Sequence, residues 1–202
     1  MNLQIRLEDR NDFKETESLI RESFWDLYKP GCDEHFIIHK LRMLPAFVSN
    51  LDFVATIDNK IVGNIIYSRA KVINDNDVEH EVLCMGPLSV LPSYQKKGIG
   101  STLINYSIKK AIEMGFKGII IFGNPDYYTR FGYKNALIYN IKTSDGINFD
   151  AFMALELYEN SLKGIEGKFY FDPVFIVAAQ ELEEFEKEFP YKEKHITDTQ
   201  LK

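Results

Sequence analysis

Near its middle the chain reads Val90-Leu91-Pro92-Ser93-Tyr94-Gln95-Lys96-Lys97-Gly98-Ile99-Gly100-Ser101. An apolar, strand-like segment precedes this stretch, and apolar residues follow it at three- and four-residue steps, as in an amphipathic helix. Gly98 and Gly100 have no Cβ, so the backbone at the helix start can approach a ligand closely. The first N–H groups of a helix have no partner within it and lie at the positive end of its dipole. The stretch therefore predicts an anion site that suits a phosphate.

Two common phosphate-binding motifs do not match this stretch. A P-loop needs Gly-x-x-x-x-Gly-Lys followed by Ser or Thr, and this string does not occur in the chain. A dinucleotide-binding turn needs a third glycine where Leu103 stands and an acidic residue roughly 20 positions further on, near Lys117. The pattern that remains is Gln-x-x-Gly-x-Gly, formed by Gln95, Gly98 and Gly100.

A second motif follows one helix and one strand later. The strand-like residues 118–123 lead into Asn124-Pro125-Asp126-Tyr127-Tyr128-Thr129-Arg130-Phe131-Gly132-Tyr133. This separation is the length of a parallel crossover between two strands. In this order, Gln-x-x-Gly-x-Gly and Tyr-x-x-Phe-Gly-Tyr resemble the pyrophosphate loop and the Tyr-x-x-x-Gly-Phe signature of the GNAT superfamily of acyl-CoA-dependent N-acyltransferases. The alternative is a βαβ unit with a tyrosine-rich turn and no ligand.

Periodicity and turn signals predict the other elements of the chain. Helices are expected at residues 12–25 with Asp12 as the cap, 33–44, 98–115 and 180–189, and strands at 3–8, 53–57, 61–73, 81–90, 118–123, 134–143 and 150–157, the last two joined across Ser144-Asp145-Gly146. These elements predict an α/β fold, a mixed sheet with helices on both faces. The resemblance implies a GNAT-like, mostly antiparallel sheet. We expect one domain over residues 1–202, with a core at about 1–157 and a C-terminal extension at 158–202 packed on it.

Composition places the chain among ordinary soluble proteins, with 45% hydrophobic and 27% charged residues. No apolar run approaches the roughly 20 residues of a membrane span, and the N-terminal residues lack a secretion pattern, so we expect a cytoplasmic protein without a membrane partner. The two cysteines, Cys32 and Cys84, lie in different predicted elements and are expected to be reduced. The histidines are scattered, and no metal site is predicted. The net charge of −6 argues against nucleic acid as a partner and mildly favours a cationic substrate.

The resemblance implies acetyl-CoA as cosubstrate and assigns residues to it. The pantetheine arm is expected along strand residues whose backbone can pair with its amides, and the pyrophosphate against the loop and helix start. Asn124 is expected to replace the pantetheine-binding Asn of many family members, whose position holds Ile121 here. The N–H of Val90 is the expected oxyanion donor, and Tyr128 the expected general acid for the CoA thiolate, with Tyr127 as its rival. The cofactor-binding residues are therefore Leu88, Ser89, Val90, Gln95, Lys96, Lys97, Gly98, Ile99, Gly100, Ser101 and Asn124.

The general base and the acceptor stay open. Candidates for the base, which must accept a proton from the amine, are Glu22, Asp33, Glu34, His35, Glu81, Cys84 and Glu156. The resemblance implies an N-acetyltransferase that transfers an acetyl group from acetyl-CoA to a primary amine, by direct attack on the thioester, with a small molecule as the favoured acceptor. A protein or peptide amine acetyltransferase, a non-catalytic acyl-CoA sensor and a partner-binding module are the alternatives. The oligomeric state is open, with a homodimer as one alternative.

Overall fold

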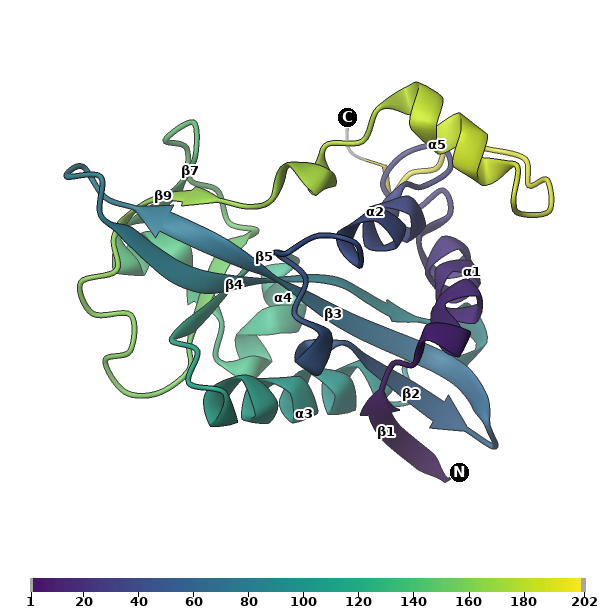
Figure 1. Ribbon diagram of the computed structural model, residues 1–202, viewed down its shortest axis with the longest axis horizontal. Helices are drawn as coiled ribbons and strands as arrows, with labels where there is room; N and C mark the ends of the chain where they lie inside the picture. The colour runs from purple at the N-terminus through teal and green to yellow at the C-terminus, as the bar shows by residue number, and fades with distance from the viewer. Residues whose placement is uncertain (1, 201–202) are drawn as a thin grey trace. The chain divides into compact units, whose positions relative to one another are not determined.

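The computed structural model describes residues 2–200, which form two compact units (Figure 1). Within the described residues, unit 1 takes in 2–66, 87–103 and 173–200, and unit 2 takes in 67–86 and 104–172. Three elements pass from one unit into the other: β3 (Lys60–Ile73), β4 (Glu79–Val90) and α3 (Ile99–Glu113). The fold is mixed α/β with a mostly antiparallel sheet flanked by helices, as the sequence predicts.

In unit 1, β1 (Leu3–Leu7), β2 (Phe53–Ile57) and the first half of β3 pair in this order, all antiparallel. Every residue of β2 is buried, which suits its continuous apolar run. The predicted hairpin between β2 and β3 is confirmed. Its turn residues Asp58 and Asn59 have φ of 49° and 64°, and successive positive φ angles are those of the tight turns that match strand twist.

Helices α1 (Phe13–Phe24) and α2 (Glu34–Leu41) belong to unit 1, where their apolar residues meet those of the strands. Asp12 stands at the N-cap position of α1, as expected, but its side chain makes no capping hydrogen bond to this helix. A 3-10 turn, Arg10–Asp12, precedes α1, and the Asp12 carboxylate accepts from the Asp9 N–H at 2.8 Å and from Arg6 at 2.9 Å instead. The core of the unit contains Leu19, Ile20, Ile38, Leu41, Val54, Ile61, Ile66 and Val174.

In unit 2 the sheet continues from the second half of β3, in the order β3-β4-β5-β8-β6. β5 (Gly118–Phe122) pairs parallel with β4 and antiparallel with β8 (Phe152–Glu156), which also pairs with β6 (Lys134–Asn135). A further strand, β9 (Gly167–Tyr170), was not expected from the sequence. It pairs antiparallel with the end of β3 and parallel with β7 (Ile141–Thr143).

Of the two strands expected at residues 134–143 and 150–157, the second is present as β8 and the first is not continuous. A 3-10 turn, Ala136–Tyr139, interrupts the first of these segments and ends at Asn140, whose φ is 55°. The Asn140 carbonyl accepts from the Gly167 N–H at 3.0 Å, so the chain beyond it runs beside β9. The break leaves two short strands with different partners, because β6 pairs with β8 and β7 pairs with β9. Residues 144–146 form a turn, but the loop after it does not return along β7.

The helix expected at residues 180–189 is present as α5 (Ala179–Glu186), in unit 1. Phe185 and Phe189 are 6% and 8% exposed and pack with Phe36 of α2, so the predicted apolar face is confirmed. Figure 1 shows α5 beside α2. Arg21 of α1 donates to the Glu186 carboxylate at 2.7 and 3.1 Å. These contacts tie the C-terminal residues of the unit to its first two helices.

We expect Phe185→Ala to lower the free energy of unfolding by about 3 kcal/mol, because truncation of a buried Phe loses transfer energy and leaves a cavity. Urea unfolding followed by circular dichroism measures the change. The control is Tyr191→Ala at a side chain that is 92% exposed, and its effect should stay within about 0.5 kcal/mol. Equal midpoints for Phe185→Ala and the unchanged protein would contradict the packing described for α5.

Candidate active site

Strand β4 is interrupted just before its last residues. In its parallel pairing with β5, Leu83 lies opposite Ile119 and Cys84 lies opposite Ile120. Gly86 then has a φ of 142°, a value at which an L side chain is strained, and Pro87 has no N–H to give to a neighbouring strand. Glycine and proline inside a strand signal such an interruption, and the sequence prediction missed it. The strand residues assigned to the pantetheine arm begin directly after this point.

Side chains alternate along the end of β4. Leu88 and Val90 are partly exposed, whereas Ser89 is 1% exposed. A Cβ at Gly63 of β3 would lie 3.1 Å from the Ser89 carbonyl oxygen and 3.2 Å from Ile99 Cγ2 of α3. Gly63 therefore lets β3, the end of β4 and the start of α3 approach closely within unit 1. The sequence prediction missed this residue too, although a glycine within a strand is typical of a close backbone approach.

The loop after β4 is held by its own side chains. The Gln95 amide donates to the Val90 carbonyl at 3.0 Å, and the Lys97 ammonium donates to the Ser93 carbonyl at 2.8 Å. Gln95 thus shapes the loop, and the cofactor contact expected of it stays a prediction. The Leu91 N–H donates to the Val62 carbonyl at 3.0 Å and anchors the loop to β3.

The start of α3 has the geometry of an anion site. Lys96 and Gly98 have φ of 58° and 82°, and both are exposed, as is Lys97. A Cβ at Gly98 would have no heavy atom within 4 Å, so the space beside this residue is open. Ile99 is 1% exposed and fixes the first turn of the helix in the core. Unpaired N–H groups at a helix start, beside open space and basic residues, favour a phosphate.

In unit 2, Tyr128 closes the short helix α4 (Pro125–Tyr128), which begins just after β5. Asn124 caps this helix, since its side-chain oxygen accepts from the Asp126 N–H at 2.9 Å. The pantetheine contact expected of Asn124 stays a prediction. A Cβ at Gly123 would lie 2.3 Å from Tyr128 Cε2, so the Tyr128 ring lies directly against this glycine.

Other tyrosines surround the Tyr128 ring. Tyr127 and Tyr133 have ring centroids 5.0 and 5.6 Å from it. The buried Tyr133 hydroxyl donates to Met85 Sδ at 3.7 Å, and the Tyr67 hydroxyl lies 2.8 Å from Ser107 Oγ. Burial raises the pKa of both Tyr67 and Tyr133 above its ordinary value, so both phenols keep their protons at neutral pH. The sequence did not point to Tyr67.

Several candidates for the general base are already paired with cations. Glu81 interacts with Arg69 at 2.7 Å and Glu22 with Lys192 at 2.8 Å, while Asp33 is paired with Lys29. Glu156 accepts from the Leu162 N–H at 3.1 Å. In unit 2, burial raises the pKa of the Cys84 thiol to about 12, so this residue is a neutral thiol near pH 7.

His35 and Glu34 differ from the carboxylates paired with cations, because burial shifts the pKa of each toward its neutral form. His35 is fully buried between Phe185 and Phe189, and desolvation lowers its pKa to about 4. Its Nε2 lies 2.7 Å from Glu186 Oε1, in an orientation that does not make a hydrogen bond. Burial raises the pKa of Glu34 to about 7, and a carboxyl group with this value exchanges protons readily at neutral pH.

The described residues contain no group of three or more His, Cys, Asp or Glu side chains that could hold a metal ion. Across residues 2–200, none of the helices has the length and apolar character needed to cross a membrane.

Comparison with known proteins identifies the family. The model of the acetyltransferase (GNAT) family matches residues 18–133, and the chain belongs to this family. It is an acetyl-CoA-dependent N-acetyltransferase. The chain is similar to the uncharacterized N-acetyltransferase YhbS of Escherichia coli K12, with 26% identity over 164 residues that cover 81% of this chain and 92% of YhbS. It also resembles the uncharacterized N-acetyltransferase YjhQ of the same strain, with 34% identity over 86 residues, 42% of this chain and 46% of YjhQ.

Solved structures share the fold. The crystal structure of Escherichia coli YhbS in complex with CoA matches with a TM-score of 0.77 and 24% identity, over 87% of this chain and 92% of that one. A GNAT family acetyltransferase from Brucella melitensis in complex with acetyl-CoA matches with a TM-score of 0.69 and 25% identity, over 86% of this chain and 98% of the other. Acetyl-CoA is therefore the cosubstrate of this chain, as predicted.

The pKa of Glu34 predicts a pH dependence of stability. A carboxyl group with a raised pKa in the folded protein contributes stability that is fully present below about pH 4.5 and is lost as the pH rises through about 7. Glu34→Gln stays neutral, so its stability relative to the unchanged protein should rise by on the order of 2 kcal/mol between pH 4 and pH 8. Urea unfolding at both pH values measures this difference, and a difference that does not change with pH would contradict the burial of Glu34.

Proposed function

We propose that this chain transfers the acetyl group of acetyl-CoA to the primary amine of a small molecule, by direct attack of the amine on the thioester. The observation that carries the CoA part of this proposal is the helix start at Gly98, where exposed backbone and open space meet two lysines. The pyrophosphate binds the N–H groups of residues 97–101, and Lys96 and Lys97 add positive charge.

The end of β4 holds the pantetheine arm. Gly86 and Pro87 end the regular pairing of β4, and the backbone of residues 88–90 is then available to the amides of the arm, as a strand edge is to another strand. Ser89 contributes only through its backbone, since its side chain is buried. The N–H of Val90 donates to the thioester oxygen as negative charge develops on it.

The amine must be neutral when it attacks, and the CoA thiolate must gain a proton as it leaves. The amine proton passes to a base or to water. Tyr128 donates the proton to the leaving sulfur. Its support is its place in the sequence motif and its fixed ring, which lies against Gly123 and between Tyr127 and Tyr133.

We expect Gly98→Val to abolish CoA binding, because a branched side chain takes the space proposed for the pyrophosphate. CoA at about a hundred times its dissociation constant should raise the free energy of unfolding of the unchanged protein by about 2.7 kcal/mol. The same concentration of CoA should not stabilise the variant. Thermal melts with CoA, NAD and ATP measure both effects.

Gly115→Val is the matched control for this experiment. Gly115 follows the other end of α3, has a φ of 80° and, like Gly98, would place its Cβ in open space. Both variants therefore carry similar backbone strain of about 1 to 3 kcal/mol, and only Gly98→Val should lose the CoA response. A response to NAD or ATP but none to CoA would refute the proposed cofactor site.

We expect Tyr128→Phe to lower the turnover number at least tenfold and to leave the dissociation constant of acetyl-CoA within a few-fold. The hydroxyl acts only as the C–S bond breaks, so its loss affects the transition state more than the bound ground state. General acid catalysis contributes about 10² to 10⁴ in rate. The retained ring keeps its contact with Gly123, so stability should not change.

Tyr127→Phe is the control for this assignment, because Tyr127 is the adjacent residue of the same helix. Stopped-flow assays of thiol release, run beside calorimetry with acetyl-CoA, separate turnover from binding. If Tyr127→Phe shows the loss and Tyr128→Phe does not, the roles of the two residues are exchanged. If neither variant loses activity, no tyrosine of this pair protonates the thiolate.

A further inference from the structure

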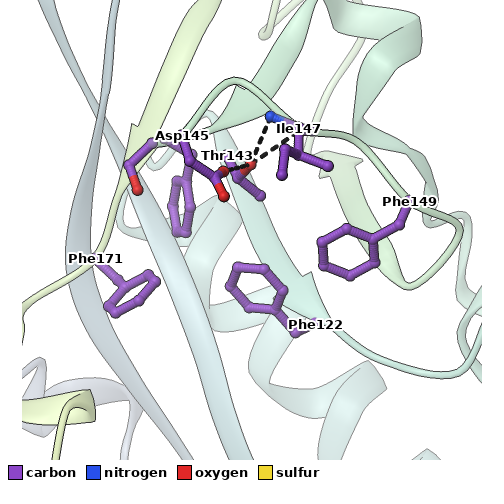
Figure 2. Close-up of a pocket in the computed structure, with 8 residues that line it drawn as sticks. Phe122, Thr143, Asp145, Ile147, Phe149 and Phe171 are labelled. Atoms are coloured by element: carbon purple, nitrogen blue, oxygen red, sulfur yellow. Dashed lines mark hydrogen bonds between the residues drawn. The ribbon is translucent and has the colours of Figure 1, made fainter.

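Unit 2 contains a cavity of about 370 Å³ that none of the assigned acetyl-CoA residues lines (Figure 2). It lies between the end of β5, the turn after β7 and the end of β9. Its apolar wall consists of Phe122, Phe149, Phe169, Phe171 and Ile147, and its polar edge of Thr143, Ser144 and Asp145. The volume falls near the lower end of the range for small-molecule sites, about 300 to 1,000 Å³.

Phe122 is at the centre of this cavity. Its ring centroid lies 6.0 Å from those of Phe149 and Phe171, and Figure 2 shows these rings on either side of it. Phe122 remains 47% exposed and Ile147 55% exposed. Large apolar side chains that are partly exposed around a concave surface are typical of a binding site for an apolar group.

The polar edge of the cavity carries a negative charge. Of the residues that line the cavity, all in the described part of the chain, Asp145 alone is charged. The Thr143 hydroxyl donates to its carboxylate, and this hydrogen bond lowers the pKa of Asp145, so the group is ionised at neutral pH. Lys168 of β9 acts on Asp145 electrostatically, but it does not line the cavity. A ligand with a cationic end is therefore favoured over one with an anionic end.

The cavity and the Tyr128 ring lie on opposite faces of β5. The Tyr128 ring lies against Gly123, and a Cβ at Gly123 would also be 3.2 Å from Ile121 Cδ1, so Ile121 and Gly123 share the face that Tyr128 covers. Side chains alternate along a strand, which places Phe122 on the other face. The amine must approach the thioester carbon from a side that CoA does not occupy, and the cavity opens on the face of β5 that Tyr128 does not cover.

We infer that this cavity is the acceptor site, and that the acceptor is a small amine with an aromatic or branched apolar body and no carboxylate beside the amine. This inference rests on the proposed acetyl transfer and adds the acceptor class to it. The apolar body fills the space around Phe122. Asp145 attracts the amine in its protonated form and repels a carboxylate on the adjacent carbon. The ammonium group passes its proton to water before the neutral amine attacks.

Phenethylamine, ethylamine and phenylalanine test these features one at a time. Phenethylamine should have a kcat/KM at least about tenfold above that of ethylamine, which lacks the apolar body, and at least about tenfold above that of phenylalanine, which adds a carboxylate. Ligand-observed NMR in the presence of CoA should detect bound phenethylamine independently of turnover. Absence of bound phenethylamine from a protein that binds CoA overturns the inference.

Two matched variants locate the site. Ile147→Trp places a large side chain in the cavity, whereas Ile138→Trp makes the same change at an isoleucine of unit 2 that is 64% exposed and does not line it. Ile147→Trp should lower kcat/KM for phenethylamine at least about tenfold and remove its NMR signal, and Ile138→Trp should change kcat/KM by less than about twofold. Equal effects of the two variants overturn the inference.

Asp145→Asn tests the charge. It should lower the ratio of kcat/KM for phenethylamine to kcat/KM for phenylalanine about tenfold, because the repulsion of the phenylalanine carboxylate is lost. An unchanged preference overturns the role of Asp145. The dissociation constant of CoA, measured by calorimetry on every variant, separates the two proposals. If the unchanged protein does not bind CoA, the proposed function is refuted. If it binds CoA but Ile147→Trp binds phenethylamine as well as the unchanged protein does, only the acceptor site is refuted.

Discussion

The close approach at Gly63 is the constraint on which the CoA site depends. A Cβ at this position would lie 3.1 Å from the Ser89 carbonyl oxygen and 3.2 Å from Ile99 Cγ2 of α3, which is closer than side chains normally approach. The end of β4, where we propose the thioester, and the start of α3, where we propose the pyrophosphate, keep this close approach to β3 because no side chain lies between them. The loop that joins them is held in turn by the hydrogen bonds from the Leu91 N–H to the Val62 carbonyl and from the Gln95 amide to the Val90 carbonyl. A close-packed turn of this kind holds its N–H groups in place before the ligand arrives.

The sequence predicted the elements that carry local signals. The α3 helix, with Gly98 before it and Gly115 after it, shows apolar periodicity and glycines at both ends, and the Asp58-Asn59 turn has residues that tolerate positive φ. The prediction was wrong where pairing depends on distant residues. Nothing within residues 134–157 shows that β7 will pair with β9, because that partner comes later in the chain and is too short for a clear pattern.

Parts of the candidate site were beyond sequence reasoning for a related reason. Glu34 and His35 are adjacent in the sequence, yet burial moves the pKa of the first to about 7 and of the second to about 4. These shifts come mainly from loss of water around each group, and that loss depends on neighbours such as Phe185 and Phe189 from the far end of the chain. The motif residues were predictable because a phosphate site needs particular backbone shapes. The acidity of a buried group is set by packing, and packing is not local.

The position of α5 has a consequence for the order in which the protein folds during synthesis. Residues 104–172 of unit 2 are made before residues 173–200, which complete unit 1. Until α5 has been made, Phe36 lacks the Phe185 and Phe189 rings that cover it, and Arg21 lacks the Glu186 carboxylate. A nascent chain that has already passed the CoA motifs therefore still exposes an apolar face on α2 and an uncompensated arginine on α1. Such a face is a binding surface for chaperones, so unit 1 finishes folding after unit 2 even though it contains the first residues to be made.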